Sequence, residues 1–372
     1  MSQVFYRKYR PKTFSEVVGQ ENIVKTLTNA LKMGIISHGY LFCGPRGSGK
    51  TTIARLFAKS LNCEKRKDKE FEPCNQCSNC LEVNEGRSID LTEIDAASNR
   101  GIDDIRELKE GIRFAPTKSK YKIFILDEAH QLSKEAFNAL LKTLEEPPVH
   151  AIFILATTEI HKMIPNIISR CQRFDFSRLK LPQIIGRLET IAGKERIKIE
   201  KAGLELIALN SGGSFRDAES ILDQVATFAS EPDKKQIVIK AEDIRNLLGI
   251  TENQEISQIA GFLADKNAVQ AITLLNQAFD QGADLTQFAI QLTNYLHAGL
   301  LYKIGGEDLH DPLTDGLTDE EFSKLKEFAG KFGSDDLRNL INLFLDAQQK
   351  MKTSPILQLP LELAIAEFCD IK

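Results

Sequence analysis

The stretch Tyr40–Thr51 constrains this chain most, because an apolar run breaks there into a glycine-rich loop that opens onto a helix. After the loop, apolar residues recur at helical spacing at Ile53, Phe57 and Leu61. Strand, loop and helix in this order are typical of a P-loop, in which backbone amides and the helix N-terminus bind the phosphates of a nucleotide. A glycine-rich turn with an incidental lysine is the alternative, and the order of the elements argues against it.

Both the backbone and the side chains of the loop can contact a bound nucleotide. Its glycines let the backbone wrap tightly, so that successive amides point at the phosphates. We expect the Lys50 ammonium to reach the β- and γ-phosphate oxygens and the Thr51 hydroxyl to hold Mg²⁺. The residues of this stretch that we expect to bind ATP are Gly44, Pro45, Arg46, Gly47, Ser48, Gly49, Lys50, Thr51 and Thr52.

A second motif follows an apolar strand that begins at Tyr121 and ends in two carboxylates, Asp127 and Glu128. Open α/β sheets bind their ligands at the carboxyl edge of the strands. We therefore expect Asp127 to support Mg²⁺, directly or through water, and Glu128 to orient the water that attacks the γ-phosphate. Either carboxylate alone could be an ordinary helix cap. The presence of Lys50 and Thr51 argues against that interpretation.

Further strands are expected over Ile89–Ile94 and Ala151–Ala156. The second of these ends at Thr157, whose hydroxyl could sense the γ-phosphate or hold the attacking water. Arg100 precedes an apolar-striped helix, which makes it a candidate phosphate contact, although an arginine near a helix start is usually solvated.

Two more arginines stand near the ends of elements. Arg170 is suited to reaching the phosphate of a neighbouring subunit, whereas in isolation it would be surface charge. Arg216 lies in the first turn of a predicted helix, where a cation opposes the helix dipole. A phosphate partner would explain its position as well as exposure to solvent does.

Four cysteines with the spacing C-x₁₀-C-x₂-C-x₂-C predict a metal centre: Cys63, Cys74, Cys77 and Cys80. Four thiolates this close suit tetrahedral Zn²⁺. An iron–sulfur cluster is the chemical alternative, but no further cysteine with a proline follows Cys80 at ferredoxin spacing. With all four positions filled by protein, the metal has no open site for substrate, so we expect a structural role.

Composition narrows the class of protein. Among 372 residues, 48 basic and 52 acidic side chains give a net charge of −4, so nucleic-acid contact should be local rather than spread over the whole molecule. The apolar runs are too short to cross a membrane, and the N-terminus lacks the apolar core of a signal peptide. We therefore expect a cytoplasmic protein. The aromatic lead-in Tyr6–Pro11 could close over an adenine ring or be a packed arm.

The chain changes character at Pro182, after which strands become scarce and apolar positions recur at helical spacing. We expect an α/β ATP-binding domain over residues 1–178, with its zinc module at 63–80. A helical lid is expected over 179–243 and a helical collar over 244–372. The last region contains no recognisable chemistry, and packing or oligomerisation is its simplest role.

Together these residues resemble the γ/τ subunits of the bacterial DNA polymerase III clamp loader. The motifs that carry the resemblance are Tyr9–Gln20, Gly44–Thr51, the four-cysteine insert, Leu126–His130, Ala156–Thr158, Ser169–Cys171 and Gly213–Asp217. The likeness covers essentially the whole chain and is densest in residues 1–230.

The resemblance implies an AAA+ ATPase with a parallel sheet flanked by helices, a zinc-binding insert, a small helical lid and an all-α collar. ATP would lie between Val17, Val18, the P-loop and Arg216. Thr157 would be the first sensor and Arg216 the second, and Arg170 would be an arginine finger that completes the site of the adjacent subunit.

The family further implies a hetero-pentamer of clamp-loader subunits, assembled through the collar, that uses ATP to open a sliding clamp and load it onto primer–template DNA. A weakly hydrolysing scaffold subunit of such an assembly is the alternative, as is a Holliday-junction type AAA+ motor, which would leave the zinc insert unexplained. Since the longer τ product of this family continues beyond the point where this chain stops, we expect either the short form or a truncated one, and we infer no helicase or polymerase binding for it.

Overall fold

The computed structural model describes residues 3–98, 111–112, 114–230, 237–248, 253–280, 282–306 and 319–369. The chain divides into two compact units, Met1–Val238 and Ile239–Lys372. Arg100, a predicted phosphate contact, lies outside the described residues, as does most of the helix expected after it.

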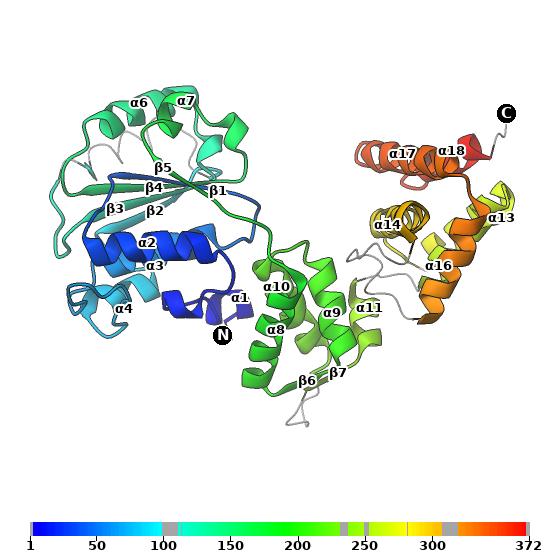
Figure 1. Ribbon diagram of the computed structural model, residues 1–372, viewed down its shortest axis with the longest axis horizontal. Coiled ribbons are helices and arrows are strands. Elements are labelled where there is room, and N and C mark those ends of the chain that lie inside the picture. The colour runs from blue at the N-terminus through cyan, green and yellow to red at the C-terminus, as the bar shows by residue number, and fades with distance from the viewer. Residues whose placement is uncertain are drawn as a thin grey trace. The chain divides into compact units, whose positions relative to one another are not determined.

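The first unit is built on a parallel sheet of five strands among the described residues, in the order β2-β3-β4-β1-β5 (Figure 1). The strands are β1 (Gly39–Cys43), β2 (Leu91–Asp95), β3 (Lys122–Asp127), β4 (Ala151–Thr157) and β5 (Gln172–Asp175). The three central strands are apolar because helices cover both faces of the sheet, as is usual for parallel sheets. The sequence-based prediction of a parallel sheet flanked by helices is confirmed.

Helices α2 (Glu21–Met33) and α3 (Lys50–Leu61) cover one face of the sheet, and α6 (Lys134–Glu145) and α7 (Pro165–Ile168) cover the other (Figure 1). Each face of the sheet carries its own hydrophobic core. Residues of β1 contribute alternately to one core and to the other, since successive side chains of a strand point to opposite faces. Phe42 packs in the core with Phe57 of α3. Leu41 packs on the opposite side with Leu140 of α6.

One helix begins at a side-chain cap, and one strand begins later than the sequence predicts. Ser133 caps the start of α6, because its Oγ accepts a 3.1 Å hydrogen bond from the Ala136 amide. Strand β2 begins at Leu91 rather than at Ile89. Ile89 is 61% exposed, whereas the Asp90 side chain is turned to the backbone amides of Thr117, Lys118 and Ser119.

After the sheet, the first unit continues in helices α8 (Leu181–Glu195), α9 (Lys201–Asn210) and α10 (Phe215–Phe228). A short two-stranded sheet pairs β6 (Ile197–Ile199) with β7 (Ile237–Ile239). The apolar positions predicted to form one face of α8 are buried at Ile184, Leu188 and Ile191. This helical part therefore has a core of its own next to the sheet.

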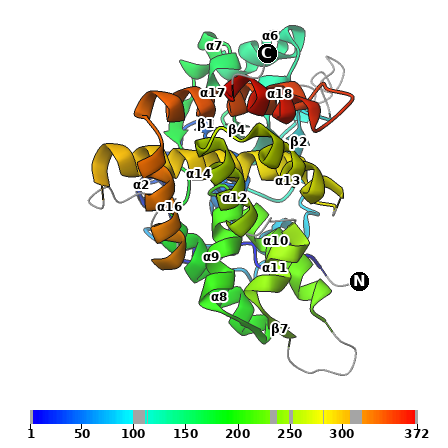
Figure 2. The same ribbon diagram turned by 90° about the vertical axis from the view of Figure 1, so that its right-hand side faces the viewer.

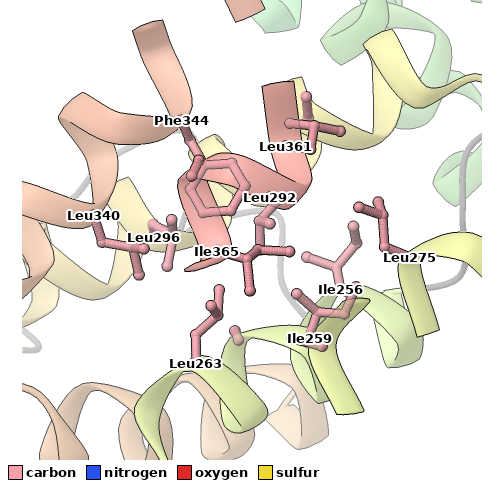
Figure 3. Packing of buried hydrophobic residues seen from close by; sticks show 14 of the residues in the cluster. Ile256, Ile259, Leu263, Leu275, Leu292, Leu296, Leu340, Phe344, Leu361 and Ile365 are labelled. Atoms are coloured by element: carbon pink, nitrogen blue, oxygen red, sulfur yellow. The ribbon is translucent and has the colours of Figure 1, made fainter. Parts of the chain in front are cut away.

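After Ile239, the last residue of β7, the regular elements described in the second unit are all helices. This unit contains α11 (Ala241–Leu248), α12 (Asn253–Ala264), α13 (Ala268–Asp280), α14 (Leu285–Gly305), α16 (Asp319–Lys331), α17 (Ser334–Met351) and α18 (Leu359–Phe368). Helix α14 packs against α16 and α17, and α17 packs against α18 (Figure 2). Leu292, Phe344 and Ile365 meet in its core (Figure 3). Within the described residues, no helix is both long and apolar enough to cross a bilayer.

Candidate nucleotide site and metal centre

The P-loop runs from the end of β1 to the start of α3 and depends on glycines with positive φ. Gly47 has φ 74°, and a Cβ there would lie 1.8 Å from the Ser214 hydroxyl oxygen. Gly44 has φ 148°, and a Cβ there would lie 2.4 Å from the Phe176 carbonyl oxygen. Larger residues would therefore push the loop away from the helical part of the unit and from the chain after β5.

Lys50 is 6% exposed, and its ammonium donates hydrogen bonds to the carbonyls of Gly44 (2.8 Å) and Pro45 (2.9 Å). The two carbonyl bonds hold the ammonium inside the loop. Burial lowers the pKa of Lys50, and the carboxylates of Glu128 and Asp127 oppose that shift. The side chain is thus a buried cation that an anionic ligand would neutralise.

The carboxylates at the end of β3 lie beside the P-loop. The Thr51 hydroxyl donates a 2.8 Å hydrogen bond to Oδ2 of Asp127, so the two oxygen-bearing side chains predicted to hold Mg²⁺ lie together. Glu128 adopts a left-handed backbone with φ 46°. Its Oε2 accepts a 2.9 Å hydrogen bond from the Thr158 hydroxyl.

Thr157 ends β4 between β1 and β3, and its side chain is fully buried. Its hydroxyl lies 3.0 Å from Nδ1 of His130 and accepts a hydrogen bond from the Glu159 amide. His130 also lies near two carboxylates, at 3.5 Å from Glu128 and 3.3 Å from Glu159. A displacement of the Thr157 side chain can therefore be transmitted to Glu128 through His130.

A pocket of about 470 Å³ unites most of the predicted site. The predicted residues that line it are Val17, Val18, Arg46, Gly47, Ser48, Gly49, Lys50, Thr51, Thr52, Asp127, Glu128 and Arg216. Gly44 and Pro45 meet the site through their carbonyls, which bond Lys50. Thr157 and Arg170 are not among the lining residues.

Arg216 reaches the pocket from the first turn of α10, and its guanidinium lies 5.0 Å from the centre of the Tyr6 ring. The helix start is fixed by Ser214, whose Oγ accepts a 3.2 Å hydrogen bond from the Asp217 amide. Because Ser214 also lies against Gly47, the start of α10 and the P-loop are in direct contact.

Sequence reasoning missed a buried ion pair in the same wall of the pocket. Nε of Arg187 lies 2.9 Å from a carboxylate oxygen of Glu219, and Arg187 also donates to the carbonyl of Tyr9. Burial raises the pKa of Glu219, although Arg187 opposes the shift. The available signal was a charge on the apolar face of each helix, next to Leu188 and Leu222.

Arg170 follows α7, away from the pocket lining. Its guanidinium donates 2.6 Å hydrogen bonds to Oε1 of Glu145 and to the carbonyl of Asn166. The side chain is 31% exposed. Within this chain it is therefore positioned by α6 and α7 rather than by the nucleotide pocket of its own unit.

The four predicted metal ligands come together at the end of α3. The sulfur atoms of Cys63, Cys74, Cys77 and Cys80 all lie within 4.8 Å of one another. A Zn²⁺ with bonds of about 2.3 Å holds its sulfurs about 3.8 Å apart in a tetrahedron, so this arrangement needs little adjustment. The set is consistent with zinc.

Backbone amides support the thiolates. The amides of Gln76 and Cys77 donate to the sulfur of Cys74, and the Cys74 amide donates to that of Cys63. Burial opposes ionisation of Cys74, but the amides of Gln76 and Cys77 outweigh it and lower its pKa to about 6. A thiolate is therefore favoured at one corner of the cluster before any metal is considered.

Three family models match successive parts of the chain. One described as DNA polymerase III, delta subunit, matches residues 19–180. One described as DNA polymerase III clamp loader subunit, ATPase lid domain, matches residues 183–231. One described as DNA polymerase III subunits gamma and tau domain III matches residues 239–371.

Individual relatives extend over nearly the whole chain. DNA polymerase III subunit tau of Bacillus subtilis is 43% identical over 368 residues, which are 99% of this chain and 63% of that protein. Subunit gamma of Buchnera aphidicola from Acyrthosiphon pisum is 31% identical over 364 residues, 98% of this chain and 97% of that protein. The chain spans between 45% and 63% of the length of the first tau subunits it matches.

Among solved structures, the RuvB Holliday junction branch migration motor of Thermotoga maritima is similar with a TM-score of 0.47 and 20% identity. The match covers 68% of this chain and 78% of that one.

Proposed function

This chain belongs to the family of DNA polymerase III gamma and tau subunits, and from that premise we propose that it is an ATPase motor subunit of a clamp loader. It uses ATP binding and hydrolysis to open a sliding clamp and load it onto primed DNA. Its partners are the other subunits of a hetero-pentamer, joined through the helices of residues 244–372, together with the clamp and primer–template DNA. It acts in the cytoplasm.

A pocket in the first unit gathers the parts that ATP hydrolysis requires, and this observation carries the proposal. Lys50, which the carbonyls of Gly44 and Pro45 hold in the loop, contacts the β- and γ-phosphates. Thr51 and Asp127 would hold Mg²⁺, which would neutralise charge on the phosphates. Glu128 orients the attacking water, and the products are ADP and phosphate.

The sensors and the arginine finger link this chemistry to conformation. Thr157, at the end of β4, senses the γ-phosphate as the first sensor. Arg216, at the start of α10, senses it as the second. Arg170 completes the site of the adjacent subunit, in keeping with its position outside the pocket of its own chain. ATP then bridges two subunits, so loss of the γ-phosphate loosens the assembly and releases the closed clamp.

Val17 and Val18 line the pocket and would contact the adenine, and Tyr6 lies close to Arg216 in the same lining. We propose that Zn²⁺ bound by Cys63, Cys74, Cys77 and Cys80 has a structural role, because all four ligand positions belong to the protein. The scaffold alternative is less favoured, since Lys50, Thr51, Asp127 and Glu128 all line one pocket, where together they would bind ATP with Mg²⁺ and activate water.

Two variants test the assignment by separating ATP binding from turnover. Lys50→Ala should abolish ATP binding, because it removes the cation that contacts the phosphates. Glu128→Gln should keep binding and lose turnover, because the amide cannot polarise water as a carboxylate does. The measurements are ATP affinity by calorimetry and phosphate release in the assembled complex. Normal hydrolysis by either variant would remove the assignment.

A further inference from the structure

The segment Lys12–Val18, here called the strap, forms part of the pocket wall through Glu16, Val17 and Val18. It contains one short 3₁₀ turn, Phe14–Glu16, and no strand or α-helix. Such a segment needs partners elsewhere in the molecule to hold a fixed position. Those partners come from residues 63–85, here called the cysteine module, and from Lys59 of α3.

Glu72 of the cysteine module binds the strap backbone with both carboxylate oxygens. Oε2 accepts from the Phe14 amide and Oε1 from the Ser15 amide, each at 2.8 Å. Carboxylate acceptors make stronger hydrogen bonds than neutral ones, and two bonds to consecutive amides also fix direction. The Phe14 ring is 2% exposed and lies 6.3 Å from the ring of Phe71, which adds an apolar contact beside the polar one.

A second anchor holds the start of the strap. The Lys12 carbonyl accepts from Nζ of Lys59 at 2.8 Å and from Nδ2 of Asn75 at 3.1 Å. Lys59 is 3% exposed and also donates to Oδ1 of Asn75 (2.7 Å) and of Asn84 (2.8 Å). Lys59 belongs to α3, the helix that begins at the P-loop, so one helix joins the phosphate site to this anchor.

The chain before the strap is tied to the helices that follow the sheet. The Tyr9 hydroxyl and the Lys8 ammonium both reach Oε1 of Glu195 at the end of α8, and Arg187 of α8 bonds the Tyr9 carbonyl. The N-terminal chain therefore runs from α8 to the cysteine module along the rim of the pocket.

We propose that the cysteine module is a clasp that keeps the strap in place for nucleotide binding, with Glu72, Asn75 and Lys59 as positioning residues. It rests on the proposed function in one respect, namely that the pocket binds ATP. Without the clasp, the strap spends time away from the pocket. The apparent affinity then falls in proportion to the fraction of molecules whose pocket is complete.

The test uses the whole chain and two variants that remove clasp contacts. Glu72→Gln removes the carboxylate that accepts from two amides. Asn75→Gly removes one of the two donors to the Lys12 carbonyl, and glycine tolerates the φ of 53° found there. Glu85→Gln is the matched control, because Glu85 is an exposed residue of the same module whose ion pair is with Arg87. The readouts are hydrogen exchange at the Phe14 and Ser15 amides and ATP affinity by calorimetry.

Glu72→Gln should speed exchange of both amides and weaken ATP binding by about tenfold, and Asn75→Gly should shift both in the same direction. Glu85→Gln should leave both readouts unchanged. Unchanged exchange in both clasp variants would overturn the proposal, as would faster exchange without any loss of ATP affinity. Failure of the unmodified chain to bind ATP would instead count against the proposed function, and exchange would still decide whether the clasp holds the strap.

Discussion

The Thr51 hydroxyl donates a 2.8 Å hydrogen bond to Oδ2 of Asp127, although the two residues lie 76 positions apart. The contact joins the start of α3 to the end of β3, across the carboxyl edge of the sheet. The contact therefore holds the two oxygen ligands proposed for Mg²⁺ close together, which favours their joint binding of one ion.

Thr51→Ala should weaken ATP binding in the presence of Mg²⁺ by about tenfold or more, because it removes one oxygen ligand of the ion. Thr51→Ser keeps the hydroxyl and should bind nearly as well as the unmodified chain. Calorimetric titration of ATP with and without Mg²⁺ measures the difference. Equal affinities of the Ala and Ser variants would show that the hydroxyl does not hold the ion.

Arg170→Ala should lower the rate of ATP hydrolysis in the site of the adjacent subunit rather than in the pocket of the subunit that carries the substitution. When the variant is mixed with unmodified chain in the assembled complex, neighbouring sites should lose at least about a hundredfold in rate, as expected for an arginine finger. Arg173→Ala is the matched control, since that arginine is exposed on β5 and pairs with Asp175. If Arg170→Ala affected the activity of its own pocket alone, the proposed role in the adjacent site would be wrong.

Metal analysis of the reduced protein should find about one zinc per chain, as four thiolates bind one tetrahedral ion. Cys77→Ser should lose the metal and about 2 kcal/mol or more of stability, which corresponds to a fall of about 4–8 °C in melting temperature for a unit of this size. Cys171 lies outside the cluster, so the Cys171→Ser protein should keep the metal. Iron in place of zinc, or no metal, would contradict this assignment.

Asp90→Asn should destabilise the first unit by about 1–3 kcal/mol, because an amide cannot accept from all three amides that the carboxylate now binds. Burial opposes ionisation of Asp90, but the amides of Thr117, Lys118 and Ser119 lower its pKa below the usual 3.8.

The sign of the pH dependence follows from that shift. A lowered pKa in the folded state means that the carboxylate stabilises the fold fully above pH 3.8 and progressively less as the pH falls through its folded pKa. The stability difference between the Asp and Asn proteins should thus be largest near neutral pH and shrink in acid. Thermal unfolding from pH 3 to 7 measures it, and a constant difference would contradict the role given to the charge.

Features of the fold that are set by residues close together in the sequence could be predicted from it. The P-loop, the apolar strands and the Ser133 cap are local patterns, each set by a few consecutive side chains. The four cysteines also cluster as expected, since Cys74 and Cys80 are close in sequence and the end of α3 carries Cys63 to them.

Contacts between distant segments escaped prediction, because nothing local distinguishes their residues from solvated ones. Glu72 reads as a loop carboxylate, yet it binds amides 57 and 58 positions away. The pair of Arg187 and Glu219 likewise depends on how α8 and α10 pack. The order of the strands could not be derived either, since each apolar run fits any central position in a parallel sheet.

The most direct test of the motor function is the ATPase rate of the assembled complex, measured with and without sliding clamp and primed DNA. If ATP hydrolysis drives clamp loading, the rate should rise clearly when clamp and primed DNA are present together, and Glu128→Gln should abolish that rise. A rate that is the same with and without clamp and primed DNA would contradict the account.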